Sequence, residues 1–425
     1  MTQRPLEWRP SARMRSLLTV SVAALIAALV VRSPELAVLA APLLLAVAAG
    51  AGRQRPTELG VSVEVGSRRC FEGEKVDLSL RLHTDSPPGQ IEAALDLPAS
   101  VEVVDGSPRQ SVAGTHEVEV GWAVRPSRWG RWSLGPVRIA VRDRGRLHTA
   151  EQTVTAGELW VFPRPPRLTR LVLPATLPER IGDHTTRVPG EGTEFVGIRP
   201  YVPGDWQRRI NWPATTRRGR LHVNQFAVEH AADVVVVIDA LSDVGPPDQT
   251  TLDLSVRGAA GIASGYLRGG ADRVGIVTLG GMLRWLGPDL GERQFFRIVE
   301  TVLDIRRDES VVDPNLARIP RRVLPPKALL IVFSPLLDER AIEAVRDLRE
   351  RRYRIVVMDV LTTEPAAAPD TTLARLALRA WRLDRRALAF RLAELGVPVV
   401  PWDGLRPLDE TLAALSRRPL AWRHR

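Results

Sequence analysis

The sequence predicts a multidomain protein: an N-terminal transmembrane helical hairpin, an all-β sandwich, and then an α/β doubly wound domain. Three observations predict this fold class. Two uncharged apolar runs lie near the N-terminus, short runs that alternate apolar and polar residues follow them, and the last part alternates β-branched apolar runs with helical patterns. At 425 residues the chain is long enough for two or three domains, each with its own core.

The first element is a pair of apolar runs, within residues 16–51, that the turn sequence RSPE separates. Each run is shorter than the about 20 residues that span a bilayer, but flanking arginines extend the effective length. Because arginines precede and follow the pair, we expect a multi-pass protein of the cell membrane with two helices. Residues 1–15 form its cytoplasmic N-terminus, and the large C-terminal region is cytoplasmic too. A cleaved signal peptide is the alternative, but it leaves the second apolar run without a role.

The second element, residues 57–163, is predicted to be an antiparallel β-sandwich, because runs such as VDLSLRLHT alternate apolar and polar residues between turn-rich gaps. The single cysteine, Cys70, cannot form an internal disulfide and is expected to be a buried or half-buried thiol. Residues 164–191 form a proline-rich connector. Four tryptophans are expected in the core and rim of the sandwich: Trp122, Trp129, Trp132 and Trp160.

Residues 192–229 form a signature segment that combines carboxylates, arginines and aromatic side chains in GTEFVGIRPYVPGDWQRRINWPATTRRGRLHVNQF. Asp205 follows a Pro-Gly turn, where a carboxylate can accept backbone N–H bonds. The sequence predicts that the acids Glu194 and Asp205 pair with the nearby Arg199 and Arg208, since buried charges are tolerated when they are paired. Three aromatic residues are expected to cover these pairs: Phe195, Tyr201 and Trp212.

Three further arginines of this segment, Arg217, Arg218 and Arg220, have no acidic residues close to them in sequence. Guanidinium groups bind oxyanions and carboxylates with two parallel hydrogen bonds. We therefore expect these three side chains to contact an outside partner.

The last element, residues 230–425, alternates apolar strands such as DVVVVID with helical patterns, which is typical of a parallel sheet with helices on both faces. In such sheets function lies at the carboxyl ends of the strands, here near Asp239, Ser334 and Asp359. Asp239 and Asp243 offer oxygen ligands for a hard cation such as Mg²⁺. Alternatively, these two carboxylates cap turns and the following helix.

The sequence lacks the motifs of several enzyme classes. The two lysines, Lys75 and Lys327, do not follow a glycine, so a P-loop is excluded. G-x-S-x-G, H-E-x-x-H and a dinucleotide fingerprint are also absent, and the seven histidines are scattered. The formal net charge is +10, but acids lie between the arginines, so no specific nucleic acid is expected as a partner. The sequence therefore predicts a protein that is not an enzyme.

The signature segment resembles the domain of unknown function 58 family, whose motif reads G-x-E-F, R-x-Y, P-G-D-x-x-R-x-I-x-W and A-T-x-R. Pro200, Asn211 and Pro213 depart from the residues common in that family. The matching positions are Glu194, Phe195, Arg199, Tyr201, Gly204, Asp205, Arg208, Ile210, Trp212 and Arg217.

The resemblance implies the layout of a membrane hairpin, a β-rich segment, the signature and a domain similar to von Willebrand factor type A. Many members are encoded beside MoxR-type AAA+ ATPases and are thought to act as adaptors in complex assembly or in envelope and stress functions. It therefore implies a non-enzymatic, membrane-anchored adaptor that works with a MoxR-type AAA+ ATPase and, through its hairpin, with the lipid bilayer.

The resemblance also bears on metal binding. Type A domains that bind Mg²⁺ use D-x-S-x-S after the first strand, but here both serine positions are changed, from Asp239 to Asp243. No cofactor is therefore expected. The alternative is a Mg²⁺-dependent ligand-binding or hydrolytic protein that uses a degenerate site at Asp239 and Asp243.

Overall fold

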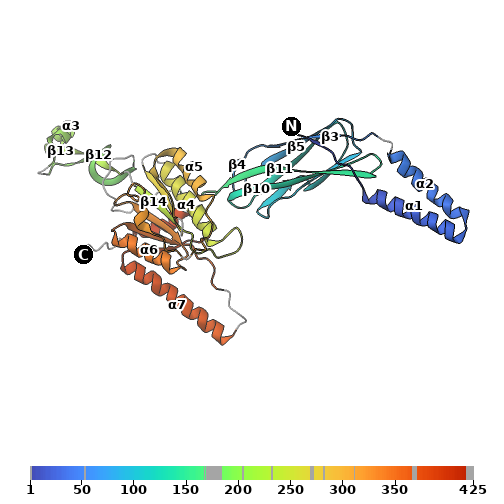
Figure 1. Ribbon diagram of the computed structural model, residues 1–425. Helices are drawn as coiled ribbons and strands as arrows, with labels where there is room; N and C mark the ends of the chain where they lie inside the picture. Colours follow the sequence, from blue (N-terminus) through green and yellow to red (C-terminus); the bar gives the residue numbers. More distant parts are fainter. Residues whose placement is uncertain are drawn as a thin grey trace. The chain divides into compact units, whose positions relative to one another are not determined.

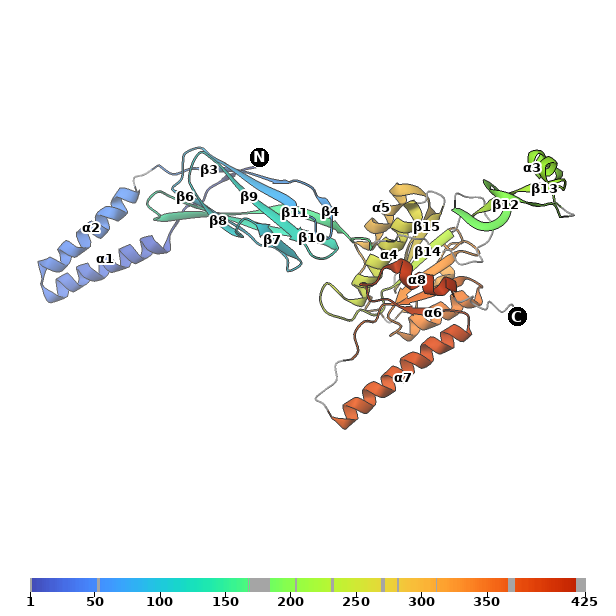
Figure 2. The same cartoon turned by 180° about the vertical axis from the view of Figure 1, so that it is seen from behind.

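The computed structural model describes residues 2–51, 54–166, 168, 184–202, 205–230, 233–268, 272–280, 283–310, 312–365 and 371–417. The chain forms two compact units, Met1–Phe162 and Pro163–Arg425. The first unit contains two helices and a β-sandwich, and the second contains an α/β sheet and a separate pair of strands (Figures 1 and 2).

The N-terminal helices α1 (Ala12–Val31) and α2 (Pro34–Ala51) follow each other across a tight turn, in which Arg32 adopts a left-handed conformation with φ 55°. Among the described residues, α1 alone is long and apolar enough to cross a membrane, with a mean hydropathy of 2.2, and α2 supplies a shorter apolar stretch. A signal sequence near an N-terminus has the same properties. The predicted pair of apolar helices is confirmed, whereas two membrane crossings stay a prediction.

The sandwich consists of two sheets that enclose one apolar core. Strand β5 shows the reason: every second side chain is buried, because successive side chains of a strand point to opposite faces. The first sheet has the order β1 (Thr2–Pro5), β3 (Glu58–Val65), β5 (Val76–Thr84), β9 (Glu117–Pro126), β7 (Val101–Asp105). The second has the order β2 (Arg9–Pro10), β11 (His148–Phe162), β10 (Gly130–Arg142), β6 (Gln90–Leu95), β8 (Arg109–Ala113), and β4 (Arg69–Phe71) pairs with β11.

The sandwich includes residues that precede the helices, which the sequence did not predict. Strand β1 pairs with β3 and β2 pairs with β11, so both ends of the helical pair enter the same domain. These short edge strands have no alternating apolar pattern and were therefore missed. The expected places of the tryptophans are confirmed, since Trp122 and Trp129 are buried and Trp132 and Trp160 are half-buried.

The prediction for Cys70 is also confirmed, because its thiol is buried beside β11. Burial raises the pKa of Cys70 to about 12, and the charge of Glu74 acts in the same direction. The thiolate is the reactive form, so this cysteine is inert at neutral pH while the sandwich is folded.

The second unit is built on a six-stranded sheet in which β16 alone runs antiparallel to its neighbour. Six of the seven residues of β14 are buried, as a strand covered by helices on both faces requires. The strand order is β16 (Arg284–Asp289), β15 (Arg273–Leu279), β14 (Asp233–Asp239), β17 (Leu329–Ser334), β18 (Arg354–Asp359), β19 (Val399–Pro401). The helices are α4 (Thr251–Arg268), α5 (Gly291–Val302), η2 (Leu316–Arg318), α6 (Glu339–Glu350), α7 (Thr372–Glu394) and α8 (Leu408–Arg417).

The two faces of this sheet carry different helices. Leu348 of α6 and Leu388 and Leu392 of α7 share one core cluster with alternate residues of β14, β17 and β18. The other face includes Phe333, whose ring meets Trp402 and the glycine face of α4. The doubly wound arrangement is thus as expected, apart from β16 and α8, which the sequence did not predict. The likeness to von Willebrand factor type A stays a prediction.

Candidate functional site

The signature segment forms a β-hairpin with a helical insertion. Its strands are antiparallel, with Arg199 opposite Val223. The chain leaves the first strand with the amide of Tyr201 donating to the carbonyl of Leu221 at 2.9 Å, which holds the insertion against the second strand. In Figure 1, α3 lies beside this pair of strands. The elements in order are β12 (His184–Pro200), η1 (Gln207–Arg209), α3 (Trp212–Arg218) and β13 (His222–His230).

An ion pair closes the turn after β12. Arg199 Nη1 and Nη2 donate to the two carboxylate oxygens of Asp205 at 2.7 and 2.5 Å, and the amide of Val202 donates to the same carboxylate at 2.8 Å. The hydrogen bond from Arg199 lowers the pKa of Asp205. The predicted pairing of Arg199 with Asp205 is confirmed, and this arginine is accordingly engaged within the loop.

A capped turn of helix positions the arginines that follow. The Asn211 side chain accepts the amide of Ala214 at 2.9 Å and donates to Asn224 Oδ1 at 2.7 Å. Asparagine is a favoured cap, because its oxygen satisfies an N–H that the helix leaves without a partner. Gly219 ends α3 with φ 63°, a conformation that glycine adopts readily. The departure from the family pattern at Asn211 thus preserves a cap.

One aromatic side chain, that of Trp212, lies differently from the prediction. The Arg208 guanidinium lies 4.2 Å from the centre of the Trp206 ring, so its partner among the described side chains is an aromatic face. Trp206 is 54% exposed and Trp212 is 64% exposed. The expectation that Trp212 covers a charge pair is therefore wrong. Trp212 opens a helix of only seven residues, none of them buried, so its ring points into solvent.

These residues form what we call the hairpin surface. It contains two exposed tryptophans and four exposed arginines, and Asp205 is the only carboxylate from residue 197 to residue 223. The apolar Val202 and Leu221 are exposed near it. The members of the hairpin surface are Trp206, Arg208, Trp212, Arg217, Arg218 and Arg220.

The remaining signature positions have varied places. Ile210 is half-buried and bridges to Val223, and Tyr201 is half-buried. Glu194 and Phe195 belong to β12, but their side chains lie outside the described part, so their predicted roles stay predictions. Gly204 lies outside the described residues.

A second cluster lies at the carboxyl ends of the parallel strands, where the sequence predicted it. Ser334 Oγ donates to Asp239 Oδ2 at 2.6 Å and accepts the amide of Leu336 at 2.9 Å. The amide of Leu241 donates to the other Asp239 oxygen at 2.9 Å. Asp359 lies beside Ser334 in the register of the sheet. The strand order thus brings the three predicted residues together.

Two arginines from the covering helices supply the positive charge of this cluster. Arg385 on α7 donates to Asp359 Oδ2 at 2.6 Å and to the carbonyls of Pro335 and Leu336. Arg340 on α6 binds Asp338 through Nε and Nη2, and this hydrogen bond lowers the pKa of Asp338. Sequence reasoning missed both arginines, because no local motif connects them to the acids.

The two carboxylates considered as metal ligands have separate partners. Asp239 is completely buried, and each of its oxygens accepts a hydrogen bond from a neighbouring group. Asp243 accepts the amide of Leu252 at 3.1 Å and so satisfies the first turn of α4. This favours the capping interpretation of Asp243. A cation such as Mg²⁺ needs six oxygens in a nearly ideal octahedron, and this donor set, with Arg340 close to Asp239, does not suit it.

Titration with Mg²⁺ tests this conclusion. We expect the thermal unfolding midpoint of the detergent-solubilised chain to stay unchanged up to millimolar Mg²⁺ or Mn²⁺, because a ligand stabilises a fold only when it binds the native state. A saturable rise of the midpoint that Asp239→Ala abolishes would reinstate the metal-dependent alternative.

The Asp239 carboxyl predicts a pH dependence. Burial raises its pKa to about 6, although hydrogen bonds from Ser334 and Leu241 oppose the shift. Because the folded value exceeds the unfolded one, the stability from this group is full below about pH 4 and is lost as the pH rises through about 6. Asp239→Asn should therefore gain about 2 kcal/mol of stability relative to the native chain between pH 4.5 and 7.5. Denaturant unfolding of both proteins at the two pH values measures this gain. A stability difference between the variant and the native chain that is the same at both pH values would contradict the prediction.

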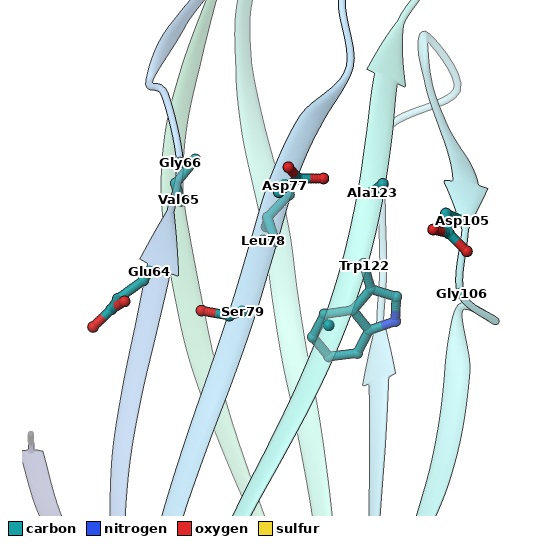
Figure 3. Close-up of a pocket in the computed structure, with 11 residues that line it drawn as sticks. Glu64, Val65, Gly66, Asp77, Leu78, Ser79, Asp105, Gly106, Trp122 and Ala123 are labelled. Carbon is teal, nitrogen blue, oxygen red and sulfur yellow. The ribbon is translucent and has the colours of Figure 1, made fainter.

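The sandwich contains a hollow of about 520 Å³ on the outer face of β3, β5, β9 and β7 (Figure 3). Carboxylates from Asp77 and Asp105 line it, and Lys75 Nζ lies 3.6 and 3.9 Å from them. A lysine of the same unit is thus the shared partner of these two carboxylates.

Comparison with known proteins identifies the signature region. A family model described as Protein of unknown function DUF58 matches residues 197–378, which run from the end of β12 into α7. Uncharacterized proteins of Mycobacterium bovis and Mycobacterium tuberculosis are 30% identical over 202 residues. The match covers 44% of this chain and 61% of each relative.

The cupredoxin domain of amoB from Nitrosocaldus yellowstonii has a TM-score of 0.18 at 10% identity, covering 26% of this chain and 88% of that domain. Residues 197–378 of the chain are similar to the family described as Protein of unknown function DUF58.

Proposed function

We propose that the chain is a non-enzymatic, membrane-anchored adaptor that binds a MoxR-type AAA+ ATPase through the hairpin surface. The observation that supports it most is the exposure of Trp206 and Trp212 beside a group of arginines on a short, ion-paired hairpin. Tryptophan and arginine are the residues that most often dominate the binding energy of protein interfaces. The identity of the ATPase comes from the family resemblance. The hairpin surface itself indicates only which chemical groups a partner should present.

The partner should present carboxylates around an apolar recess. The described hairpin carries Arg217, Arg218 and Arg220 exposed, and its one acid near them, Asp205, is bound to Arg199. A partner that presents carboxylates would find complementary charge, which speeds association and excludes basic surfaces. The tryptophan rings would supply the apolar contact area.

The strand pairing of the sandwich supports a membrane hairpin with both ends on one side. Residues before α1 and residues after α2 pair within the same sandwich, as Gln3 with Gly60 shows. If α1 crosses a bilayer, α2 has to return the chain to the first side. Cleavage after α1 would also remove β1 and β2 from a folded domain, which argues against a signal peptide.

Cysteine labelling tests this topology directly. Glu35→Cys places a thiol in the first turn of α2, next to the connection between the two helices, and Ser67→Cys places one at an exposed position of the sandwich. We expect a membrane-impermeant maleimide to label Glu35→Cys in intact cells and to label Ser67→Cys only after permeabilisation. The native Cys70 serves as the background, since its thiol is inert. Labelling of both variants from outside would contradict a cytoplasmic sandwich.

Co-purification from native membranes tests the adaptor role. We expect a MoxR-type ATPase to accompany the native chain and to be lost from the variant Trp206→Ala/Trp212→Ala. The variant Arg321→Ser/Arg322→Ser, at two exposed arginines outside the hairpin, is the matched control and should retain the ATPase. Recovery of the native chain without an ATPase, or equal recovery with the tryptophan variant, would argue against the proposal.

A further inference from the structure

Helix α7 exposes an apolar stripe that no described part of the chain covers. Figures 1 and 2 both show the beginning of α7 extending beyond the rest of the α/β unit. Leucine and phenylalanine side chains on its outer side are between 54% and 78% exposed. The stripe consists of Leu373, Leu376, Ala380, Leu383, Ala387 and Phe390.

The opposite side of α7 is fixed to the unit, so the outer stripe cannot turn inward. Leu388 and Leu392 are buried in the core that α7 shares with the sheet. On the same side of the helix, Arg385 donates hydrogen bonds to Asp359 and to the carbonyls that follow β17. Exposure of the stripe is therefore a property of how α7 is attached.

The spacing of the stripe indicates what kind of element would cover it. Its members follow one another at intervals of three, four, three, four and three residues. This is the a and d pattern of a coiled coil, in which each side chain enters a hole on a facing helix. A flat sheet or an irregular loop would not require such spacing.

Charges beside the stripe indicate the chemistry of that helix. With the stripe at the a and d positions, the charged residues at the flanking e and g positions are Arg379, Arg386, Arg391 and a single acid, Asp384. Flanking charges decide which helices pair. We propose that α7 binds an amphipathic helix of another protein, whose apolar stripe carries carboxylates along its edges.

Two other occupants fit the same observations less well. In a parallel pair of α7 helices, Arg379 would meet Asp384 of the second copy, but Arg386 would meet Arg391, and each chain carries a net charge of +10. Asp384 also lies on the exposed side of the helix, among the apolar side chains that would have to enter a bilayer. A carboxylate at that depth is costly in a membrane and acceptable beside a coiled-coil seam.

The test uses the full detergent-solubilised chain and two designed 21-residue helices that differ only in their flanking residues. Both have leucine at a and d, one has glutamate at e and g, and the other has lysine there. We expect fluorescence anisotropy to show binding of the glutamate helix in preference to the lysine helix by about tenfold. Leu376→Gln/Leu383→Gln should abolish that binding, whereas Leu405→Gln, at another exposed leucine, should not.

Charge reversal makes the test specific. Arg379→Glu/Arg386→Glu changes no buried residue, and it should invert the preference toward the lysine helix. Equal binding of both helices, binding of neither, or a preference that survives the reversal would overturn the proposal.

Two further measurements test the other occupants. If the chain self-associates in sedimentation and Leu376→Gln/Leu383→Gln removes the association, the stripe binds a second copy instead. Adsorption to anionic vesicles removed by the same variant would assign it to a membrane. Since the hairpin surface is unchanged throughout, failure here leaves the ATPase proposal standing.

Discussion

Arg385→Met is expected to lower the free energy of unfolding of the α/β unit by about 2–4 kcal/mol. Arg385 is the hydrogen-bonded counterion of Asp359, and both side chains are largely buried, at 16% and 20% exposure. Its removal leaves a carboxylate without its counterion and also leaves the carbonyls of Pro335 and Leu336 without the Arg385 donor. The loss of one buried partner costs more than the ion pair contributes, because the remaining charge cannot regain its water.

Amide hydrogen exchange of peptides from β17 and β18 measures this effect within the detergent-solubilised chain. The expected loss corresponds to exchange that is about 30- to 800-fold faster. Arg386→Met, the next residue on the same helix, is exposed and serves as the control, with a change within about 0.5 kcal/mol. If both variants exchange alike, the Arg385–Asp359 pair does not hold the sheet edge.

The pH dependence separates a charge effect from a packing effect. Burial raises the pKa of Asp359, while Arg385 lowers it. Without Arg385 the folded-state pKa rises further, so the penalty of the variant is largest at high pH and shrinks as the pH falls and Asp359 takes up a proton. Asp359→Asn in the Arg385→Met background should recover part of the stability at pH 8. A penalty that does not change with pH would identify lost packing as the cause.

Local sequence patterns predicted those parts of the fold that local interactions determine. The apolar run DVVVVID became β14 with the same bounds, and helices alternate with such strands along the second unit as predicted. Arg199 and Asp205 are six residues apart, and their pairing followed from a single turn. β16 was missed because its sequence RWLGPD contains Gly-Pro, which usually marks a turn.

The remaining features depend on contacts that a single sequence does not reveal. Arg385 lies 26 residues from Asp359, and Ser334 lies 95 residues from Asp239. The strand order makes Ser334 and Asp239 neighbours, and the packing of α7 on the sheet brings Arg385 to Asp359. Both depend on the folded unit as a whole. The exposure of Trp212 was missed for a different reason, since a helix of seven residues has too few positions to define a buried face.

Gly258 on α4 packs so closely against the sheet that a larger side chain there should destabilise the α/β unit. A Cβ added at Gly258 would lie 2.3 Å from Phe333 Cε1 and 2.8 Å from Trp402 Cζ3. Neither ring can move away easily: Phe333 is completely buried, and Trp402 Nε1 donates to the carbonyl of Arg406 at 2.9 Å. Gly258→Ala should therefore lower the free energy of unfolding by about 2 kcal/mol. Overpacking outweighs the roughly 1 kcal/mol that alanine adds to a helix.

Gly265→Ala on the same helix is the matched control, because the three atoms nearest to its new methyl group all belong to the Leu168 side chain, the closest at 3.1 Å. That variant should be neutral or slightly stabilised, since the helix propensity of alanine then has little steric cost to overcome. Phe333→Leu, added to Gly258→Ala, makes room at the contact and should recover part of the loss, although it costs stability in the native background. Denaturant unfolding of the four variants measures the coupling. Additive losses from Gly258→Ala and Phe333→Leu would mean that α4 moves away from the sheet instead of pressing on the ring.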